Sequence, residues 1–240
     1  MIAYKDLDKD LLHPVLSNES LTYFYDLIDS MRQLIILGIF CLSTCLIQAQ
    51  ELSNFGINAK KYTPQGLAIK STAPSVSGIS GNGVKFDSRY ELRKGPIVVS
   101  FIHGSWSEDS QARIDLLTSN AAEFTGAGAQ VVIVSPETPE HVNILGDDVA
   151  SNIHLIADND TKTMKGFDVL YHVLSEWAAD EERRTGMKIG TAAKGALSLP
   201  VMATFVITMN GTVYWRHFEY DSSDQPDIEE LIQAIPQARK

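Results

Sequence analysis

Apolar and polar positions alternate along the second half of this chain in a way that predicts strands and helices in turn. Residues 97–102, 130–135 and 153–157 are short, mainly apolar runs, which is typical of strands buried on both faces of a sheet. Between the first two, residues 109–124 space their apolar side chains so that a helix would bury one face, with Ser105 or Ser107 as its cap. These runs predict a strand, a helix and a parallel strand in succession.

The flanking segments add further elements. Residues 73–76 and 80–86 predict a β-hairpin, because Asn82-Gly83 supplies the positive φ angles of a two-residue turn. A short helix at 89–93, a helix ending near 145–146 and a mostly helical, amphipathic stretch at 163–184 are also expected. A glycine-rich loop at 187–198, a strand at 199–207, an antiparallel strand at 212–218 and a last helix from Asp224-Gln225-Pro226 complete the order. The sequence therefore predicts an α/β fold, with a central mixed sheet flanked by helices and an N-terminal hairpin extension.

The composition adds two expectations, one about the size of the core and one about nucleic acid as a partner. The chain has 240 residues, 44% of them hydrophobic, which is enough for one sizeable core. The formal net charge is −10, and no cluster of lysines and arginines rises above this acidic background. Nucleic acid is therefore not expected as a partner.

Residues 31–49 have the pattern of a secretory signal peptide. Arg32 precedes an apolar run at 34–47, and a small residue, Ala49, stands before the predicted cleavage point. The run of about 14 residues is shorter than the roughly 20 that a membrane span needs. We expect an exported, periplasmic protein, and since Cys41 and Cys45 both lie in this run, the mature chain would contain no cysteine.

The acidic residues 1–30 do not fit an export signal at the extreme N-terminus. They are interpreted as an upstream extension that is not part of the native protein, with Met31 as the start. Two alternatives stay open: an uncleaved membrane anchor at 34–47, and a lipoprotein with residues 42–45 as the lipid-attachment motif. The predicted division is then 1–30 extension, 31–49 signal peptide, 50–72 a loosely packed lead-in, and 73–240 a single domain.

The stretch Gly95 to Ser110 is where an open α/β sheet usually keeps its chemistry, because a buried strand passes through a small-residue turn into a helix. Three motifs there and beyond resemble the AhpC/TSA peroxiredoxin-like family of the thioredoxin-like superfamily. They are Phe101-x-x-Gly104-x-Trp106, Ser135-Pro136-Glu137 and the run Leu-Pro-Val-x-Ala-Thr-Phe-Val-Ile at 199–207. The resemblance extends over residues 66–235 and implies a thioredoxin-like fold.

The resemblance also implies a redox site that this sequence does not complete. Ser107 and Ser110 stand at the two cysteine positions of the family's Cys-x-x-Cys, and Ser110 also stands where peroxiredoxins keep their peroxidatic cysteine. Thiolates do this chemistry because a helix N-terminus stabilises them and a second thiol resolves the product. A serine hydroxyl is far less acidic and forms no such intermediate.

The opposing loop departs from the family as well. Met202 stands where thiol-active relatives place a cis-proline, and Pro200, two residues earlier, is expected to be trans. The family's peroxide-polarising arginine is missing from its position, and Arg216 on the next strand is a remote candidate. Glu108 and Asp109 are expected to cap the helix electrostatically.

Other chemistries find little support in the sequence. His103 and Ser107 could form a hydrolase pair, but the chain has no Gly-x-Ser-x-Gly elbow. The histidines are scattered, so neither a metal site nor a cofactor is expected. Trp106 beside the loop predicts a binding cleft instead, formed by Trp106, Glu108, Val201, Met202 and Ala203.

Two functions from different classes follow. In the first, the chain is an exported binding module, for an unidentified protein or small ligand, that has lost thiol catalysis. In the alternative it is a peroxidase or thiol-disulfide oxidoreductase, through an unrecognised route or through retained Cys41 and Cys45. Serine is also the usual engineered substitute for such cysteines, which the encoding DNA at positions 107 and 110 would reveal. The resemblance further implies pairing into homodimers.

Overall fold

The computed structural model describes residues 23, 25, 27–37, 50–81, 83–146, 152–190 and 197–239. The chain divides into two compact units, Met1–Glu51 and Leu52–Lys240. In the first unit residues 27–37 are helical, and Leu34, Ile35, Ile36 and Leu37 are exposed. Both cysteines and the predicted cleavage point after Ala49 lie outside the described residues. No helix within the described ranges combines the length and apolarity needed to cross a membrane.

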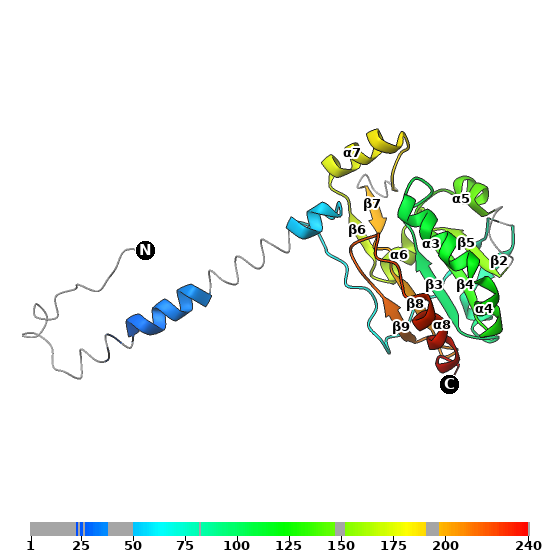
Figure 1. Ribbon diagram of the computed structural model, residues 1–240, viewed down its shortest axis with the longest axis horizontal. Helices are drawn as coiled ribbons and strands as arrows, with labels where there is room; N and C mark the ends of the chain where they lie inside the picture. Colours follow the sequence, from blue (N-terminus) through cyan, green and yellow to red (C-terminus); the bar gives the residue numbers. More distant parts are fainter. Residues whose placement is uncertain are drawn as a thin grey trace, which may run out of the picture. The chain divides into compact units, whose positions relative to one another are not determined.

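A five-stranded mixed sheet forms the centre of the second unit (Figure 1). Its order is β5-β4-β3-β8-β9, with the bounds β3 Ile97–Phe101, β4 Gln130–Ser135, β5 Ile153–Ala157, β8 Thr204–Ile207 and β9 Val213–His217. The three mainly apolar strands predicted from the sequence, β3, β4 and β5, pair in parallel, while β8 runs antiparallel to β3 and β9 antiparallel to β8. The α/β class is confirmed.

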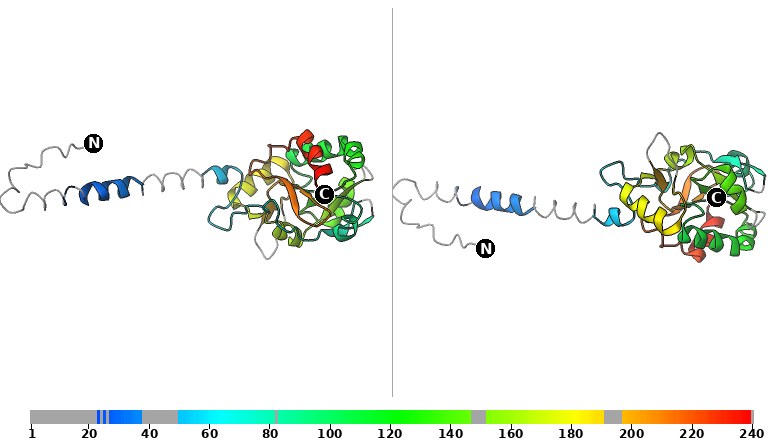
Figure 2. Two further views of the ribbon diagram at one scale, coloured as in Figure 1. Left: turned by 90° about the horizontal axis from the view of Figure 1, so that it is seen from below. Right: turned by 90° about the horizontal axis from the view of Figure 1, so that it is seen from above.

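The sheet separates two hydrophobic cores, because successive side chains of a strand point to opposite faces. On one face Val98 and Ile102 pack with α3 (Glu108–Ser119), α4 (Ala121–Gly126), α5 (Pro139–Gly146) and α8 (Ile228–Gln237). Both views of Figure 2 place α8 beside α4 on this side of the sheet. On the other face Val99 and Phe101 pack with α6 (Lys162–Gly166), α7 (Ser175–Thr185) and the hairpin that carries Phe86.

The N-terminal hairpin is present, but its first strand is displaced from the predicted 73–76. Strand β1 (Ser77–Ile79) pairs antiparallel with β2 (Lys85–Asp87), and α2 (Ser88–Glu91) follows. Gly83 has a φ of +77° at the turn, and Asn82 is outside the described residues. Residues 73–76 are held elsewhere: the Ala73 N–H donates to Gly211 and the Val76 N–H to the Ser88 hydroxyl.

Two predicted helices are interrupted. The helix expected at 109–124 breaks at Asn120, whose side-chain amide donates to the carbonyl of Leu116 at 2.8 Å, so α3 and α4 are separate. The stretch expected to be mostly helical at 163–184 contains a strand, β6 (Leu170–His172). This strand pairs antiparallel with β7 (Ser198–Pro200), a partner too distant in sequence for local periodicity to reveal.

Two further boundaries differ from the prediction. The strand expected at 199–207 is divided into β7 and β8 by the connection 201–203. The last helix begins at Ile228 rather than around Pro226, because the Asp227 carboxylate caps it by accepting the N–H groups of Glu229 and Glu230.

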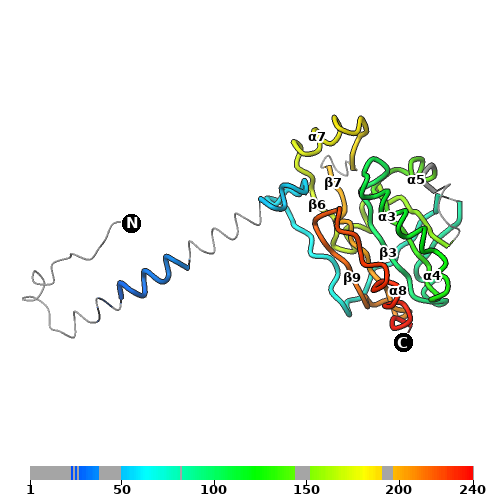
Figure 3. Tube along the Cα trace, viewed as in Figure 1, coloured from blue at the N-terminus to red at the C-terminus, as the bar shows by residue number. Residues whose placement is uncertain are grey.

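The lead-in at 50–72 is packed rather than loose, so that expectation is wrong. Leu52 and Ile57 are buried in the core, and the Asn58 N–H donates to the carbonyl of His172 at 2.9 Å. Further along, the Lys70 N–H donates to the carbonyl of Val213, so the segment covers part of the outer edge of β9 (Figure 3).

Candidate functional site

Serine 107 starts helix α3 directly after the turn that follows β3. Its backbone is extended (φ −95°, ψ 124°), and its hydroxyl oxygen accepts the N–H of Ser110 at 3.3 Å. Serine is favoured at this position because its side chain satisfies an N–H that has no partner within the helix. The helix cap therefore falls on the first of the two serines that the sequence singled out.

Glu137 holds the turn in place. Its carboxylate accepts the Ser105 N–H at 2.9 Å and the Ser105 hydroxyl at 2.5 Å, and it also accepts the hydroxyl of Ser135 at 3.1 Å. Gly104 has a φ of +126°, and a β-carbon there would lie 2.9 Å from Glu137 Cδ. Glu137 of the Ser-Pro-Glu motif thus fixes the turn through these hydrogen bonds, and glycine is required at position 104.

Ser110 is completely buried, and its hydroxyl is used inside the protein. The oxygen accepts the N–H of His103 at 3.0 Å, and the hydroxyl donates to Met202 Sδ at 3.9 Å, a contact at the long limit for sulfur. The second cysteine position of the family motif therefore faces the core. Ser107 is 5% exposed and lines a surface cavity.

His103 lies in the interior beside these serines. Its ring stacks on Trp106 with centroids 5.9 Å apart, and its Nε2 lies 3.4 Å from the hydroxyl of Tyr171. Burial lowers the pKa of the imidazole to about 4, so His103 is neutral at pH 7. Among the described residues, no hydrogen bond joins its ring to Ser107. The hydrolase pair considered from the sequence is not formed.

Arg113, one turn after Ser110, lies in the same buried region, and the sequence analysis did not identify it. Its Nη1 donates to the carbonyl of Met202 and to the hydroxyl of Thr204, each at 3.0 Å, and its Nη2 donates to the carbonyl of Asp224 at 3.2 Å. Burial lowers its pKa to about 10, which leaves it charged at neutral pH. A signal was available, since Ser110, Arg113, Ile114 and Leu117 share one helical face.

Residues 201–203, which connect β7 and β8, lie in the interior beside this region. Val201, Met202 and Ala203 are each at most 2% exposed and are not among the residues that line the surface cavity. None of the described peptide bonds is cis, so Pro200 is trans as expected. Arg216, the remote candidate, donates to the carbonyls of Gln65 and Leu67 at 3.0 Å and so holds the lead-in rather than the site.

A surface cavity of about 280 Å³ lies over the start of α3. Trp106, Ser107, Glu108 and Asp109 form one side, and α7 contributes Trp177, Glu181 and Arg184. The two indoles meet edge to face with centroids 6.3 Å apart. The structure therefore brings together three residues of the predicted site, Trp106, Ser107 and Glu108, and adds a wall from α7 that the sequence did not indicate.

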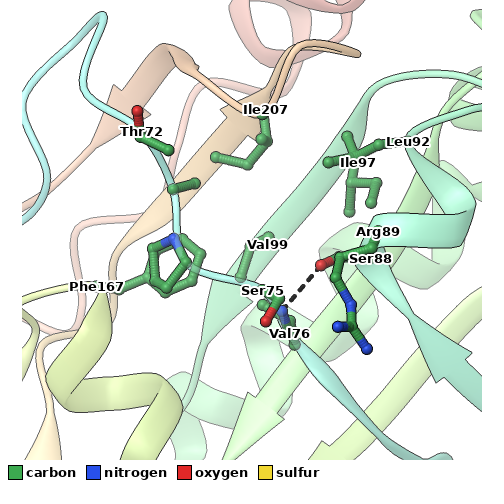
Figure 4. Close-up of a pocket in the computed structure, with 13 residues that line it drawn as sticks. Thr72, Ser75, Val76, Ser88, Arg89, Leu92, Ile97, Val99, Phe167 and Ile207 are labelled. Carbon is green, nitrogen blue, oxygen red and sulfur yellow. Dashed lines mark hydrogen bonds between the residues drawn. The ribbon is translucent and has the colours of Figure 1, made fainter.

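A smaller cavity of about 150 Å³ lies near the start of β3 (Figure 4). Its walls are mostly apolar, including Val99, Phe167 and Ile207, and the Ser88 hydroxyl beside it accepts the Val76 N–H. Arg89 at its edge pairs with Asp87, so this cavity offers apolar contact rather than chemistry. Within the described ranges, no group of three or more histidine, cysteine, aspartate or glutamate side chains could hold a metal ion.

Comparison with known proteins identifies the scaffold. No curated protein matches the sequence. Among solved structures, the peroxidoxin BcpB of Mycobacterium tuberculosis superimposes with a TM-score of 0.53 at 16% identity, covering 72% of this chain and 99% of that protein. Reduced Prx3 of Vibrio vulnificus gives 0.53 at 18% identity, covering 70% and 97%. The mitochondrial 2-Cys peroxiredoxin of Plasmodium falciparum gives 0.52 at 12% identity, covering 71% and 93%.

These neighbours share the thioredoxin-like peroxiredoxin fold, as the resemblance implied. The sequence itself matches the model of the AhpC/TSA family over residues 69–216, which include the turn after β3, both serines and the 201–203 connection. The chain belongs to the AhpC/TSA family.

Proposed function

We propose that this protein is a binding module on an AhpC/TSA scaffold and that it has lost thiol redox catalysis. The observation that carries the proposal is the environment of Ser110, which is fully buried with its hydroxyl bonded to the His103 N–H and to Met202 Sδ. A group held in this way supports the loop and is not presented to a substrate.

The chemistry of the other groups supports the same proposal. In the described part of the chain no hydrogen bond joins Ser107 to the imidazole of His103, whose Nε2 lies near the Tyr171 hydroxyl instead, so the histidine does not activate this serine. Residues 50–240 contain no cysteine, so the part of the chain that carries the domain has no thiol to attack a peroxide or to resolve a sulfenic acid. The cavity beside Ser107, with its two tryptophans, remains available for binding.

Turnover assays test the loss of catalysis. Hydrogen peroxide reduction and insulin disulfide reduction are measured with the chain from Gln50 onward and with a Ser107→Cys/Ser110→Cys variant. We expect no turnover by the native sequence and measurable turnover by the variant, because helix α3 would stabilise a thiolate at its N-terminus. A Ser119→Cys variant, with an exposed thiol at the far end of α3, is the control.

The result that would overturn the proposal is turnover by the native sequence that scales with its concentration and survives repurification. Activity of that kind would favour the peroxidase or oxidoreductase alternative. An inactive native protein beside an active double variant supports loss of the thiols on a competent scaffold.

We further propose that the protein is exported to the periplasm by residues 31–49. Arg32, the apolar run and Ala49 support this proposal. N-terminal sequencing of the protein from a periplasmic extract should give Gln50 as the first residue. Intact residues 31–49 in a membrane fraction would contradict cleavage and favour an uncleaved anchor.

A further inference from the structure

We propose that the cavity between α3 and α7 binds a cationic group, an alkylammonium or guanidinium, from a free amine or a basic side chain of a partner protein. This inference rests on the proposed binding function and specifies its ligand class.

The charge around the cavity is unbalanced. Glu108, Asp109 and Glu181 line it with three carboxylates, and Arg184 is its only arginine or lysine. Burial keeps the fifth titratable neighbour, His103, neutral at pH 7. The lining residues thus carry a net charge of −2, which the nearby Arg113 offsets in part through Asp109, and a negative concave site attracts a cation before contact.

Arg184 divides its single positive charge between two of these carboxylates. Its Nε and Nη2 donate to one oxygen of Glu181 at 3.0 and 2.8 Å, and its Nη1 donates to Glu108 at the longer distance of 3.5 Å. The Glu108 side chain is 90% exposed. Asp109 accepts the hydroxyl of Ser222 and interacts electrostatically with the buried guanidinium of Arg113. An external cation can therefore compete with Arg184 for Glu108, which makes Arg184 an internal competitor in the wall of the cavity.

The aromatic walls fit the same ligand. Trp106 and Trp177 line the cavity at an interplanar angle of 71°. A cation near an indole face is stabilised by the ring quadrupole, and a lysine or arginine stem gains apolar contact along it. An anionic ligand would gain nothing from these rings and would be repelled by the rim.

A buried hydroxyl provides a further contact inside the cavity. Ser107 is 5% exposed and lines the cavity, and its oxygen accepts the Ser110 N–H. In the described part of the chain, no hydrogen bond uses the proton of this hydroxyl. Ser107 can therefore donate to a carbonyl or other acceptor on the same ligand, a contact that ionised carboxylates alone could not provide.

Titration followed by tryptophan fluorescence and by calorimetry tests the proposal. The probes are butylammonium, an acetylated and amidated Gly-Lys-Gly-Lys-Gly peptide, and the matching Gly-Glu-Gly-Glu-Gly peptide. We expect saturable binding of a cationic probe and none of the acidic peptide. Tighter binding of the lysine peptide than of butylammonium assigns the site to basic side chains, and equal or weaker binding assigns it to free amines.

Two variants should move the affinity in opposite directions. Glu108→Gln should weaken binding about 2- to 5-fold, which corresponds to the loss of one exposed charge pair. Arg184→Gln should strengthen binding about 3-fold, because it removes the internal competitor, and a merely unfolded protein could not show this gain. Glu176→Gln, on the exposed first turn of α7 and outside the cavity, is the charge-matched control and should change nothing.

Lack of saturable binding by both cationic probes would overturn the inference, as would equal binding of the acidic peptide or a loss of affinity in Arg184→Gln. The proposed function is tested separately, because peroxide and insulin turnover do not depend on whether an amine binds. An inactive protein that binds no cation would refute the ligand class alone, while an active one would refute the loss of catalysis.

Discussion

At the scale of single residues, His103 makes the stability of the protein depend on pH. Its imidazole is buried between Trp106 and Tyr171, and burial lowers its pKa from 6.5 to about 4. Between these two values the unfolded chain binds a proton that the folded protein does not. The contribution of His103 to the free energy of unfolding is therefore complete above pH 6.5, and it is lost as the pH drops toward 4.

A His103→Phe variant should remove this dependence while keeping an aromatic ring against Trp106. From pH 7 to pH 5, the free energy of unfolding of the native sequence should fall by about 2 kcal/mol more than that of the variant. Urea denaturation at both pH values measures the difference. His141→Gln, at an exposed position, is the control and should follow the native protein. Parallel pH profiles for the native and His103→Phe proteins would show that His103 does not titrate in this window.

The sequence identified some residues of this site and missed others for a physical reason. Ser107 and Ser110 were found because they follow a buried strand and a small-residue turn, which are local features. The wall formed by Trp177 and Arg184 was not found, since it comes from α7, about 70 residues further along the chain. Contacts between distant segments depend on tertiary packing, which local periodicity does not contain.

At the scale of elements, helix α3 is tied to the sheet by a buried guanidinium. Arg113 donates to the carbonyls of Met202 and Asp224 and to the hydroxyl of Thr204. Arg113 thereby joins α3 to residues 201–203 and to the segment before α8. Removing it leaves buried acceptors without their donor, which costs more than the bonds themselves contribute.

We therefore expect Arg113→Ala to lower the free energy of unfolding by about 3 kcal/mol. Arg113→Lys should recover less than half of this loss, because a single ammonium cannot reproduce the directions of the guanidinium fork. Urea denaturation at pH 7 gives both values. Arg93→Ala, at an exposed position just after α2, should change stability by less than about 0.5 kcal/mol. A similar small effect of Arg113→Ala would contradict this role.

The elements that the sequence predicted best are those with the strongest local signal. Strands β3, β4 and β5 are mainly apolar runs, and their predicted bounds hold to within one residue. Strand β6 was hidden inside a stretch predicted to be mostly helical, because what makes it a strand is pairing with β7. The start of the last helix has a local cause instead, the capping of α8 by Asp227, and the predicted start around Pro226 was too early.

At the scale of the whole molecule, the unit Leu52–Lys240 includes the lead-in as part of its core. The family model begins at residue 69, yet Leu52 and Ile57 are 7% and 1% exposed. The Leu174 N–H donates to the carbonyl of Gly56, and Arg216 holds the carbonyls of Gln65 and Leu67. The segment is therefore expected to be needed for stability although it lies outside the recognisable family region and far from the serines.

A chain that begins at Ala73 should be much less stable than one that begins at Gln50. Burying a large aliphatic side chain contributes roughly 1.5 to 3 kcal/mol, so the loss of Leu52 and Ile57 alone should cost about 3 to 6 kcal/mol. For a chain of this size that corresponds to a melting temperature lower by about 10 °C or more, measured by circular dichroism. Ile57→Ala in the longer chain creates a cavity without shortening the chain, and should by itself cost about 2 to 4 kcal/mol. Equal melting temperatures for both chains and for Ile57→Ala would mean that residues 50–72 contribute nothing to the core, whereas a loss in both locates the contribution in the buried side chains.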